Sequence, residues 1–549
     1  MGRPHALAPA ILALLLCAAQ TASGAAATAG LFRRGADAGG AASPHGPRSI
    51  SVTVDLEALR DFRLSGGGRL ALPGADGADL VIALERFEAL APGAVVTLTG
   101  DAGPVSHRPD LVFFKGCVEG EPGSLALFAM SPRGVTGRIL RDSGWLLVVP
   151  RAPGGPAEGS APGHVIVPEA DLPAPPALPF HCPSDGLARE EAAVPAGLPL
   201  LPADVEATTV RLLCQVALDC DYEFFVKEGY DADRATAYAL VMLGTCSAIY
   251  EREVNVTLQA SYLNVWTTPA DPYSATDLAT QLDEFAAYWK VNRSGVGRDL
   301  AQLVSGRTLG GGIAFLGTLC STSYGYSVIS SLNGSNVYPT NVTTWDVSVM
   351  AHELGHNFDS RHTHSCWWQQ NGYAPPGALL DSCYTAEGTC YTGTVGILPG
   401  DLGTIMSYCH LLGGVTLVRL DFHDACRTVM RYAAEHAICL SSAAVQPPMD
   451  LAVATDSAGA HLSWTASVSP YVLYYDVFRS PWQQDLEPDW IGRTAGASFD
   501  DLAIGTLWYK VRAVRSADSS AFSGEVRAAV CHPAARVAYG VGALPLGCH

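Results

Sequence analysis

Positive charge is scarce in this sequence. Its 34 lysines and arginines face 53 aspartates and glutamates, which gives a formal net charge of −19 at pH 7, and the basic residues form no cluster. Proteins that bind nucleic acid normally show the opposite balance or a basic patch, because they must neutralise phosphates. The sequence therefore argues against a nucleic-acid partner, and an acidic surface fits a soluble extracellular protein.

Long hydrophobic runs are missing as well. The apolar run at 8–19 is too short to span a bilayer, and no later stretch predicts a transmembrane helix. Arg3 precedes this run and small residues follow it at 22–24, which is the pattern of a cleaved signal peptide. We therefore expect residues 1–24 to be removed and the protein to be secreted and extracellular. A lipid anchor on Cys17 is the weaker alternative, because the residue before it is larger than such sites favour.

The composition predicts a globular chain with several domains. Hydrophobic residues make up 48% and charged residues 16%, and 549 residues suffice for about three or four domains. Of the 15 cysteines, ten lie between Cys214 and Cys439. An even block of cysteines in an exported protein predicts disulfide bonds, although the sequence does not specify which residues pair.

Patterning divides the chain into three parts. Glycine, alanine and proline dominate 25–48 and 151–202, which predicts linkers, while 50–150 has the short apolar segments of a β-rich region. Strand and helix patterns then alternate over 205–442, which predicts an α/β domain. The strand candidates are 210–218, 254–262, 299–304 and 313–319, and the helix candidates are 232–250, with Asp231 as N-cap, and 424–437.

The last part, 446–530, is predicted to be all-β. Apolar residues alternate around Trp464, Tyr475 and Tyr509 between turn-rich segments. Their order resembles a fibronectin type III module, a β-sandwich packed around an early tryptophan and a late tyrosine. That resemblance implies a ligand in the matrix or on a cell surface. In the tail, 531–549, Cys531 and Cys548 could close a loop.

Helical spacing surrounds a pair of histidines. Apolar residues recur at helical intervals from 347 to 358, and Thr343, with Asp346 three residues on, predicts the start of that helix. His352 and His356 are four residues apart, so their rings project side by side from one turn. Two neutral imidazoles in this arrangement can bind one zinc ion. Glu353, one position further round, is expected to accept a proton from water and not to bind the metal.

A third ligand follows after a turn. His362 lies six residues beyond His356, so the chain must reverse to bring it to the metal. This long motif resembles the metzincin metallopeptidases, whose methionine turn would be Thr404–Cys409 here. Residues 310–320 resemble the edge strand on which these enzymes bind extended substrates. The resemblance is to the reprolysin-like branch, which includes ADAM and ADAMTS enzymes, and it covers about 209–441.

The resemblance carries further expectations. It implies a mixed sheet, an active-site helix, a Cys320–Cys439 disulfide and, because many members bind it, a structural calcium ion. Asp359 stands where metzincins usually have glycine, so we expect it to adopt positive φ, which Asp tolerates better than most residues. Thr363 and His364 follow the third histidine where the branch has aspartate. We expect His364 to be a surface or cleft residue, although it is a rival ligand.

Two further residues have open roles. Tyr408 is either an ordinary packing residue or a metal ligand or transition-state donor. Residues 115–120 weakly resemble the pro-region of reprolysin-like enzymes, which can hold a thiolate on the metal. Cys182, near the junction, is then either that thiolate or the disulfide partner of Cys117.

The sequence thus predicts a secreted zinc-dependent endopeptidase that acts on proteins or peptides. Residues 25–204 would be its propeptide region, 205–442 its catalytic domain and 446–530 a fibronectin-like domain. One alternative is a catalytically inactive adhesion or surface-binding protein, against which the intact set of Glu353 and three histidines argues. A second is a zinc enzyme of another clan whose third ligand is a distant glutamate.

Overall fold

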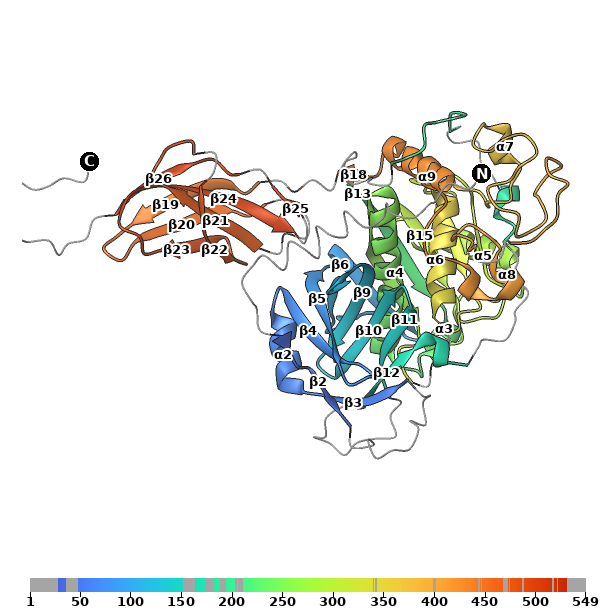
Figure 1. The fold of residues 1–549 in the computed structure, drawn as a ribbon, viewed down its shortest axis with the longest axis horizontal. Helices are drawn as coiled ribbons and strands as arrows, with labels where there is room; N and C mark the ends of the chain where they lie inside the picture. Colours follow the sequence, from blue (N-terminus) through green and yellow to red (C-terminus); the bar gives the residue numbers. More distant parts are fainter. Residues whose placement is uncertain are drawn as a thin grey trace, which may run out of the picture. The chain divides into compact units, whose positions relative to one another are not determined.

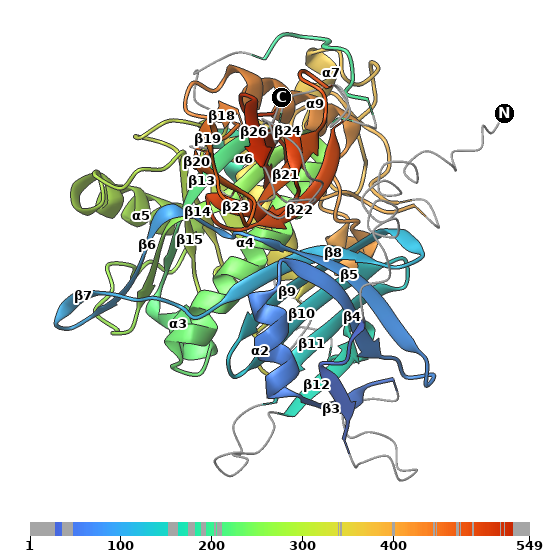
Figure 2. The same ribbon diagram turned by 90° about the vertical axis from the view of Figure 1, so that its left-hand side faces the viewer.

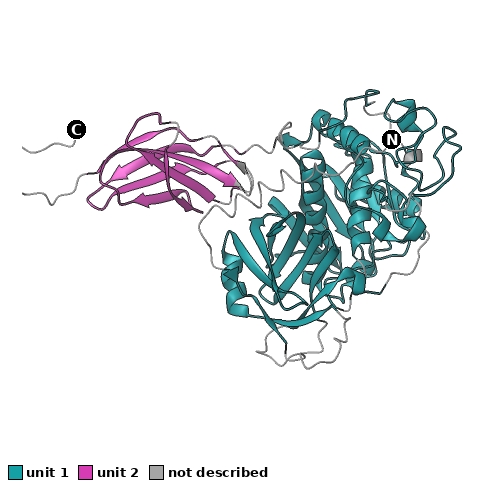
Figure 3. Ribbon diagram, viewed as in Figure 1, with its two compact units in different colours: residues 1–442 teal, residues 443–549 magenta. Residues whose placement is uncertain are grey.

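In the computed structural model, the chain divides into two compact units, residues 1–442 and 443–549 (Figure 3). The structure describes residues 28–530, apart from 36–47, 152–162, 174–181, 188–193, 203–204, 206–210, 339, 341–342, 398–400, 443–444, 446, 468–471, 473, 486–487, 516–517 and 521. The predicted signal peptide and the tail with Cys531 and Cys548 lie outside the described residues. Over the described part, no helix has the length and apolar character needed to cross a membrane.

The N-terminal residues form a ten-stranded sheet, in the order β1-β4-β5-β8-β9-β10-β11-β12-β3-β2. Figure 1 shows most of its strands, among them β4, β10 and β12, in blue and teal. Its strands are β1 Thr28–Ala29, β2 Phe32–Arg34, β3 Ile50–Val54, β4 Gly67–Pro73, β5 Asp79–Phe87, β8 Val112–Val118, β9 Glu121–Ser131, β10 Gly134–Arg141, β11 Gly144–Pro150 and β12 Gly163–Pro168, and helix α2 spans Leu56–Leu64. The prediction of linkers over 25–48 and 151–202 was partly wrong, because β1, β2 and β12 belong to this sheet. Phe32 of β2 and Val165 of β12 are buried, and this burial of apolar side chains stabilises the two strands in the sheet.

A second, mixed sheet lies at the centre of the unit. Its order is β16-β17-β15-β13-β14-β6-β7, and β18 pairs with β13. The strands are β6 Leu90–Gly100, β7 Gly103–Ser106, β13 Leu212–Cys220, β14 Val256–Trp266, β15 Leu300–Val304, β16 Gly312–Ala314, β17 Tyr326–Ile329 and β18 Ser441–Ser442. Pairing is parallel from β17 through β6, whereas β16 runs antiparallel at one edge. The predicted strands are confirmed, although the one predicted at 313–319 extends only over 312–314.

Helices cover both faces of this sheet. Val216 and Leu218 of β13 join the core beneath α4 and α6, while Ala217 joins the core beneath α5, as the alternation of strand side chains requires. The helices of the unit are α3 Tyr222–Lys227, α4 Ala232–Val254, α5 Leu278–Asn292, α6 Thr344–Asn357, α7 Trp367–Gln370, α8 His410–Gly413 and α9 Asp424–His436. Asp231 caps α4 as predicted, by accepting from the Arg234 amide at 3.0 Å. Helix α5 was not predicted.

The two sheets share one hydrophobic core. Strand β6, which belongs to the N-terminal region, pairs in parallel with β14 (Figure 2). Phe113, Leu127 and Trp145 of the N-terminal region belong to the same buried cluster as α4 and α6. An ion pair of 2.8 Å joins Lys115 to Glu251 of α4. The predicted boundary near residue 204 stays a prediction, because the segments on its two sides form one compact unit.

The second unit is all-β, as expected. Its sheets are β19-β20-β23 and β22-β21-β24-β25, with β26 paired to β24. The strands are β19 Met449–Thr455, β20 Ala460–Thr465, β21 Tyr474–Ser480, β22 Asp489–Thr494, β23 Ser498–Asp501, β24 Gly505–Arg515, β25 Asp518–Ser519 and β26 Val526–Val530. Trp464, Tyr475 and Tyr509 are buried in its core. The fibronectin type III assignment remains a prediction.

A carboxylate from the N-terminal region caps helix α6. Glu169 accepts hydrogen bonds from the amides of Thr343 and Thr344, the latter at 2.8 Å, and from both hydroxyls. The predicted helix start at Thr343 is confirmed, although the Thr343 side chain caps no amide of α6. The carboxylate of Asp346 instead accepts from the Asn333 and Gly334 amides at 2.7 and 2.8 Å and from a tyrosine hydroxyl. A negative charge at Glu169 complements the helix dipole as well as the free amides.

The other end of α6 closes through a left-handed turn. Asp359 has a φ of 70°, which confirms the expectation of positive φ. Its amide donates to the His356 carbonyl at 2.9 Å, and the Ser360 amide donates to the Gly355 carbonyl at 3.0 Å. This pair of bonds is a Schellman motif, which ends the helix and reverses the chain. The reversal directs residues 360–362 back along the helix.

Replacing Glu169 should weaken the whole unit. Glu169→Ala leaves the first amides of α6 without an acceptor, so the free energy of unfolding should fall by about 1–2 kcal/mol. Denaturant titration of the full chain measures this loss. The matched control is Glu57→Ala, an exposed acidic residue in the first turn of α2, where little change is expected. Equal effects of the two substitutions would show that the cap does not stabilise α6.

Residue 359 should tolerate only side chains compatible with positive φ. Asp359→Gly and Asp359→Asn should keep the fold and bound metal. Asp359→Val should lose stability by about 1–3 kcal/mol, because a β-branched residue is strained in this region. Thermal unfolding and metal content of the three variants decide the question. A Val variant as stable as the parent would show that the turn does not depend on this position.

Candidate metal centre and its surroundings

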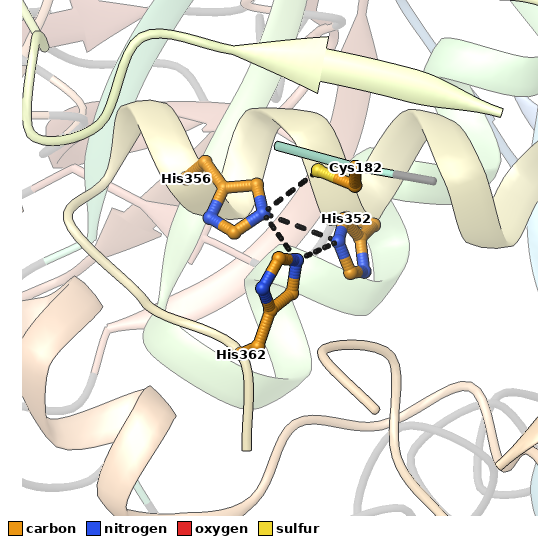
Figure 4. Close-up of side chains that lie close together, drawn as sticks. All are labelled: Cys182, His352, His356 and His362. Atoms are coloured by element: carbon orange, nitrogen blue, oxygen red, sulfur yellow. Dashed lines mark hydrogen bonds between the residues drawn. The ribbon is translucent and has the colours of Figure 1, made fainter. Parts of the chain in front are cut away.

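Three histidine rings converge on one point. The Nε2 atoms of His352 and His356, on α6, are 3.1 Å apart, and that of His362 lies 3.1 and 3.2 Å from them (Figure 4). All three side chains are buried. Helical spacing brings the first two together, and the reversal at Asp359 brings the third. The structure therefore gathers the histidines that the sequence singles out.

The opposite ring nitrogens fix the orientation of each ring. His352 Nδ1 lies 2.7 Å from the Ile405 carbonyl, and His356 Nδ1 lies 2.7 Å from the Ser360 carbonyl. Each Nδ1 therefore carries the proton, and each Nε2 directs a lone pair to the common point. Burial lowers the pKa of His352 to about 3, so this ring is neutral at physiological pH.

Glu353 lies beside the histidines and against the edge strand. Its carboxylate is fully buried, and its Oε1 accepts no hydrogen bond from a described residue. Burial raises the pKa of Glu353 well above its usual value. Gly312 of β16 allows the close approach, because a Cβ there would lie 2.5 Å from Glu353 Cγ. The carboxylate thus lies between the three histidines and the edge strand β16.

A methionine supports the cluster from below. Met406 is buried, and a Cβ on Gly355 of α6 would lie 2.9 Å from its sulfur. The Met406 carbonyl accepts from the Thr363 amide at 3.1 Å, which ties this turn to the chain after the third histidine. Residues 404–409 therefore occupy the place expected of a methionine turn. Glycine at 355 is required for that close packing.

Cys182 approaches the same point from the N-terminal region. Its sulfur lies 3.4 Å from His356 Nε2 (Figure 4). The same sulfur lies 3.6 Å from Glu353 Oε2. The Cys182 amide donates to the Tyr408 hydroxyl at 3.1 Å, and that hydroxyl donates back to the Cys182 carbonyl at 3.0 Å. Cys182 is a buried free thiol, so the alternative of a disulfide with Cys117 was wrong. Tyr408 Oη also lies 3.3 Å from His362 Nε2.

The next residues of this segment contact the edge strand. The Ala314 amide of β16 donates to Ser184 Oγ at 2.8 Å, and Ser184 belongs to the short helix η2, Ser184–Leu187. Neither Ser184 nor the cap residue Glu169 was predicted. Both act on residues more than 100 positions away, and no local pattern marks them.

His364 lies outside the converging set, and a glutamate that the sequence does not reveal lies next to it. The His364 ring stacks on His362 with an interplanar angle of 4°. Glu387 Oε1 lies 3.0 Å from His362 Nδ1 and 3.3 Å from His364 Nε2. In the sequence, Glu387 is marked only by its position between Cys366 and Cys390, which form a disulfide.

Six of the ten clustered cysteines form disulfides. The bonds are Cys320–Cys439, Cys366–Cys390 and Cys383–Cys409, and the first confirms the expected pair. The expectation that this even block pairs throughout was wrong for Cys214, Cys220, Cys246 and Cys426, which are buried and form no disulfide. These four are core side chains and not cross-links.

The converging atoms fit a single zinc ion. Cys182 Sγ and the three Nε2 atoms all lie within 4.8 Å of one another. Nitrogens bound at about 2.0–2.1 Å to a tetrahedral ion lie roughly 3.3 Å apart, close to the observed separations. Three neutral imidazoles with a fourth position for water or a thiolate form the donor set of catalytic zinc sites. The calcium ion implied by the resemblance stays a prediction.

Comparisons with known proteins agree with this chemistry. Residues 211–410 match the reprolysin-type sequence profile of Metallo-peptidase family M12. The mouse disintegrin and metalloproteinase domain-containing protein 19 is 30% identical over 165 residues, which cover 28% of this chain and 16% of that protein. The matched stretch is thus a small part of the relative. Residues 211–410 are therefore similar to the metallopeptidase domains of family M12, of the reprolysin type.

Proposed function

We propose that the chain is a secreted zinc endopeptidase in which His352, His356 and His362 hold the metal and Glu353 is the general base. The observation that carries this proposal is the convergence of three Nε2 atoms beside a buried carboxylate, within a metallopeptidase-type domain. The catalytic domain would extend over 205–442.

The residues divide the chemistry between them. Zinc, when bound, supplies a Lewis acid that polarises a peptide carbonyl and makes water more acidic. Glu353 takes a proton from the attacking water and delivers it to the leaving amine nitrogen. The three histidines would bind the metal through Nε2 and take no part in proton transfer.

The edge strand provides a place for the substrate. Strand β16 pairs with β17 on one side only, and its Ala314 amide already bonds to a side chain from another segment. An extended peptide added along this edge would bring its carbonyl near Glu353, because β16 passes directly against that side chain. Protein and peptide substrates are therefore the class that we assign to the site.

The N-terminal region would keep the enzyme latent. Cys182 lies beside the three histidines, where its thiolate would be the fourth ligand of a bound zinc ion, and Ser184 bonds to the strand that would receive the substrate. Two hydrogen bonds to Tyr408 hold the Cys182 backbone in that place. Residues 25–204 would thus act as a propeptide.

For the second unit, residues 443–549, we propose binding and not catalysis. Its buried Trp464 and Tyr509 and its two small sheets support a fibronectin type III-like module over 446–530. A matrix or cell-surface ligand is the partner that we assign to it.

Glu353→Gln should separate catalysis from metal binding. The amide keeps the shape of the side chain but cannot carry the proton, so peptide hydrolysis should fall by about 10²–10⁴-fold. Zinc content, measured by elemental analysis, should stay at one ion per chain. The comparison variant His362→Ala should lose both zinc and activity, because two protein ligands remain. Loss of zinc from Glu353→Gln would contradict the assigned roles.

Cys182→Ser should raise the basal activity of the full chain. A serine hydroxyl binds zinc far less well than a thiolate, so the fourth position becomes available to water. Hydrolysis of a peptide library before and after the substitution measures the gain, and a chelator should abolish it. Cys214→Ser is the control, since Cys214 is also a buried free thiol but lies on β13. An equally silent Cys182→Ser chain would mean that steric blocking alone causes latency.

A further inference from the structure

The three histidines differ in what holds them. Nδ1 of His352 and of His356 faces a backbone carbonyl, whereas Nδ1 of His362 faces both oxygens of Glu387, at 3.0 and 3.2 Å. A carboxylate is a stronger acceptor than a carbonyl because it carries a full negative charge. One ring of the three is therefore held by a charge-assisted hydrogen bond.

The backbone of Glu387 is fixed on both sides. Its amide donates to the His364 carbonyl at 3.1 Å, and its carbonyl accepts from the Cys366 amide at 3.0 Å. The Cys366–Cys390 disulfide closes the same loop covalently. Segments 364–366 and 387–390 are thus joined by two hydrogen bonds and a covalent cross-link. The carboxylate reaches His362 from a rigid support and not from a free loop.

Neighbouring rings confine His362 further. The buried indole of Trp368 donates to the His362 carbonyl at 2.7 Å. His364 covers one face of the His362 ring at 5.1 Å between centroids. Rotation of the His362 ring would break the bond to Glu387 and the stacking together. This part of the chain therefore holds one orientation of one ring.

We propose that Glu387 is a positioning residue for the metal centre, which fixes the tautomer and direction of His362 and strengthens its binding to zinc. The inference builds on the proposed zinc site. A carboxylate on Nδ1–H draws that proton toward itself, so electron density rises on Nε2, the atom that faces the metal. His362 lies after the Schellman turn and outside α6. The Glu387 carboxylate therefore gives this ligand an electrostatic support that the helix does not provide.

Zinc affinity tests this role directly. The metal-free full chain is titrated with zinc against a chromophoric chelator, with Cys182 intact and in a Cys182→Ser background. Glu387→Gln preserves shape and removes charge, and it should weaken zinc binding by about 10–100-fold. Glu387→Ala should weaken it at least as much. Asp381→Asn is the control. It also removes a carboxylate from this part of the chain, but the Asp381 carboxylate accepts from the Cys383 amide and not from a histidine ring.

A merely structural role would give a different result. The melting temperatures of the metal-free parent and Glu387→Gln should agree, whereas a structural role would lower the second. An unchanged zinc affinity in Glu387→Gln would overturn the proposal. The proposal would also be overturned if the parent bound two zinc ions and Glu387→Gln lost only the second one. His362, His364 and Glu387 would then form a separate metal site. A parent chain that binds no zinc would instead refute the proposed function itself.

Discussion

The close approach of three buried imidazoles, those of His352, His356 and His362, is the constraint on which the rest of this unit depends. Their Nε2 lone pairs face one another at 3.1 to 3.2 Å. Such lone pairs repel each other in a low-dielectric interior unless a cation lies between them. Acceptors on the Nδ1 atoms prevent the rings from turning away. The turn at Asp359, the packing of Met406 under Gly355 and the loop with Glu387 all serve to maintain this arrangement.

Helix α6 therefore depends on distant residues at both ends. Its first amides bond to Glu169, 174 residues before Thr343, and its last carbonyls bond to amides of the loop after β16. Gly317 donates to the His356 carbonyl, and Thr318 donates to the Asn357 carbonyl. A helix that is anchored in this way holds two ligands in fixed register. Its own sequence, which lacks a side-chain cap, would not do so.

Sequence spacing predicted what is local and missed what is distant. The side-by-side His352 and His356, the cap at Asp231 and the positive φ at Asp359 follow from helix geometry and backbone sterics, so they could be predicted. The start of α6 at Thr343 was predicted as well, but its cap was not, because Asp346 bonds to the Asn333 amide while Glu169 accepts from the first amides of the helix. Contacts of this kind depend on how two sheets pack, which no pattern within a few residues encodes.

The shared core also limits what a cut in the chain can do. The segment 174–211 joins the two halves, but the β6–β14 pairing, the Glu169 cap and the Lys115–Glu251 ion pair all lie outside it. A break within that segment therefore leaves each of these contacts in place. Separating the halves would expose apolar side chains such as Leu127, at about 1.5–3 kcal/mol each. Separation of the halves would also remove the N-terminal cap of α6, because Glu169 lies in one half and Thr344 in the other.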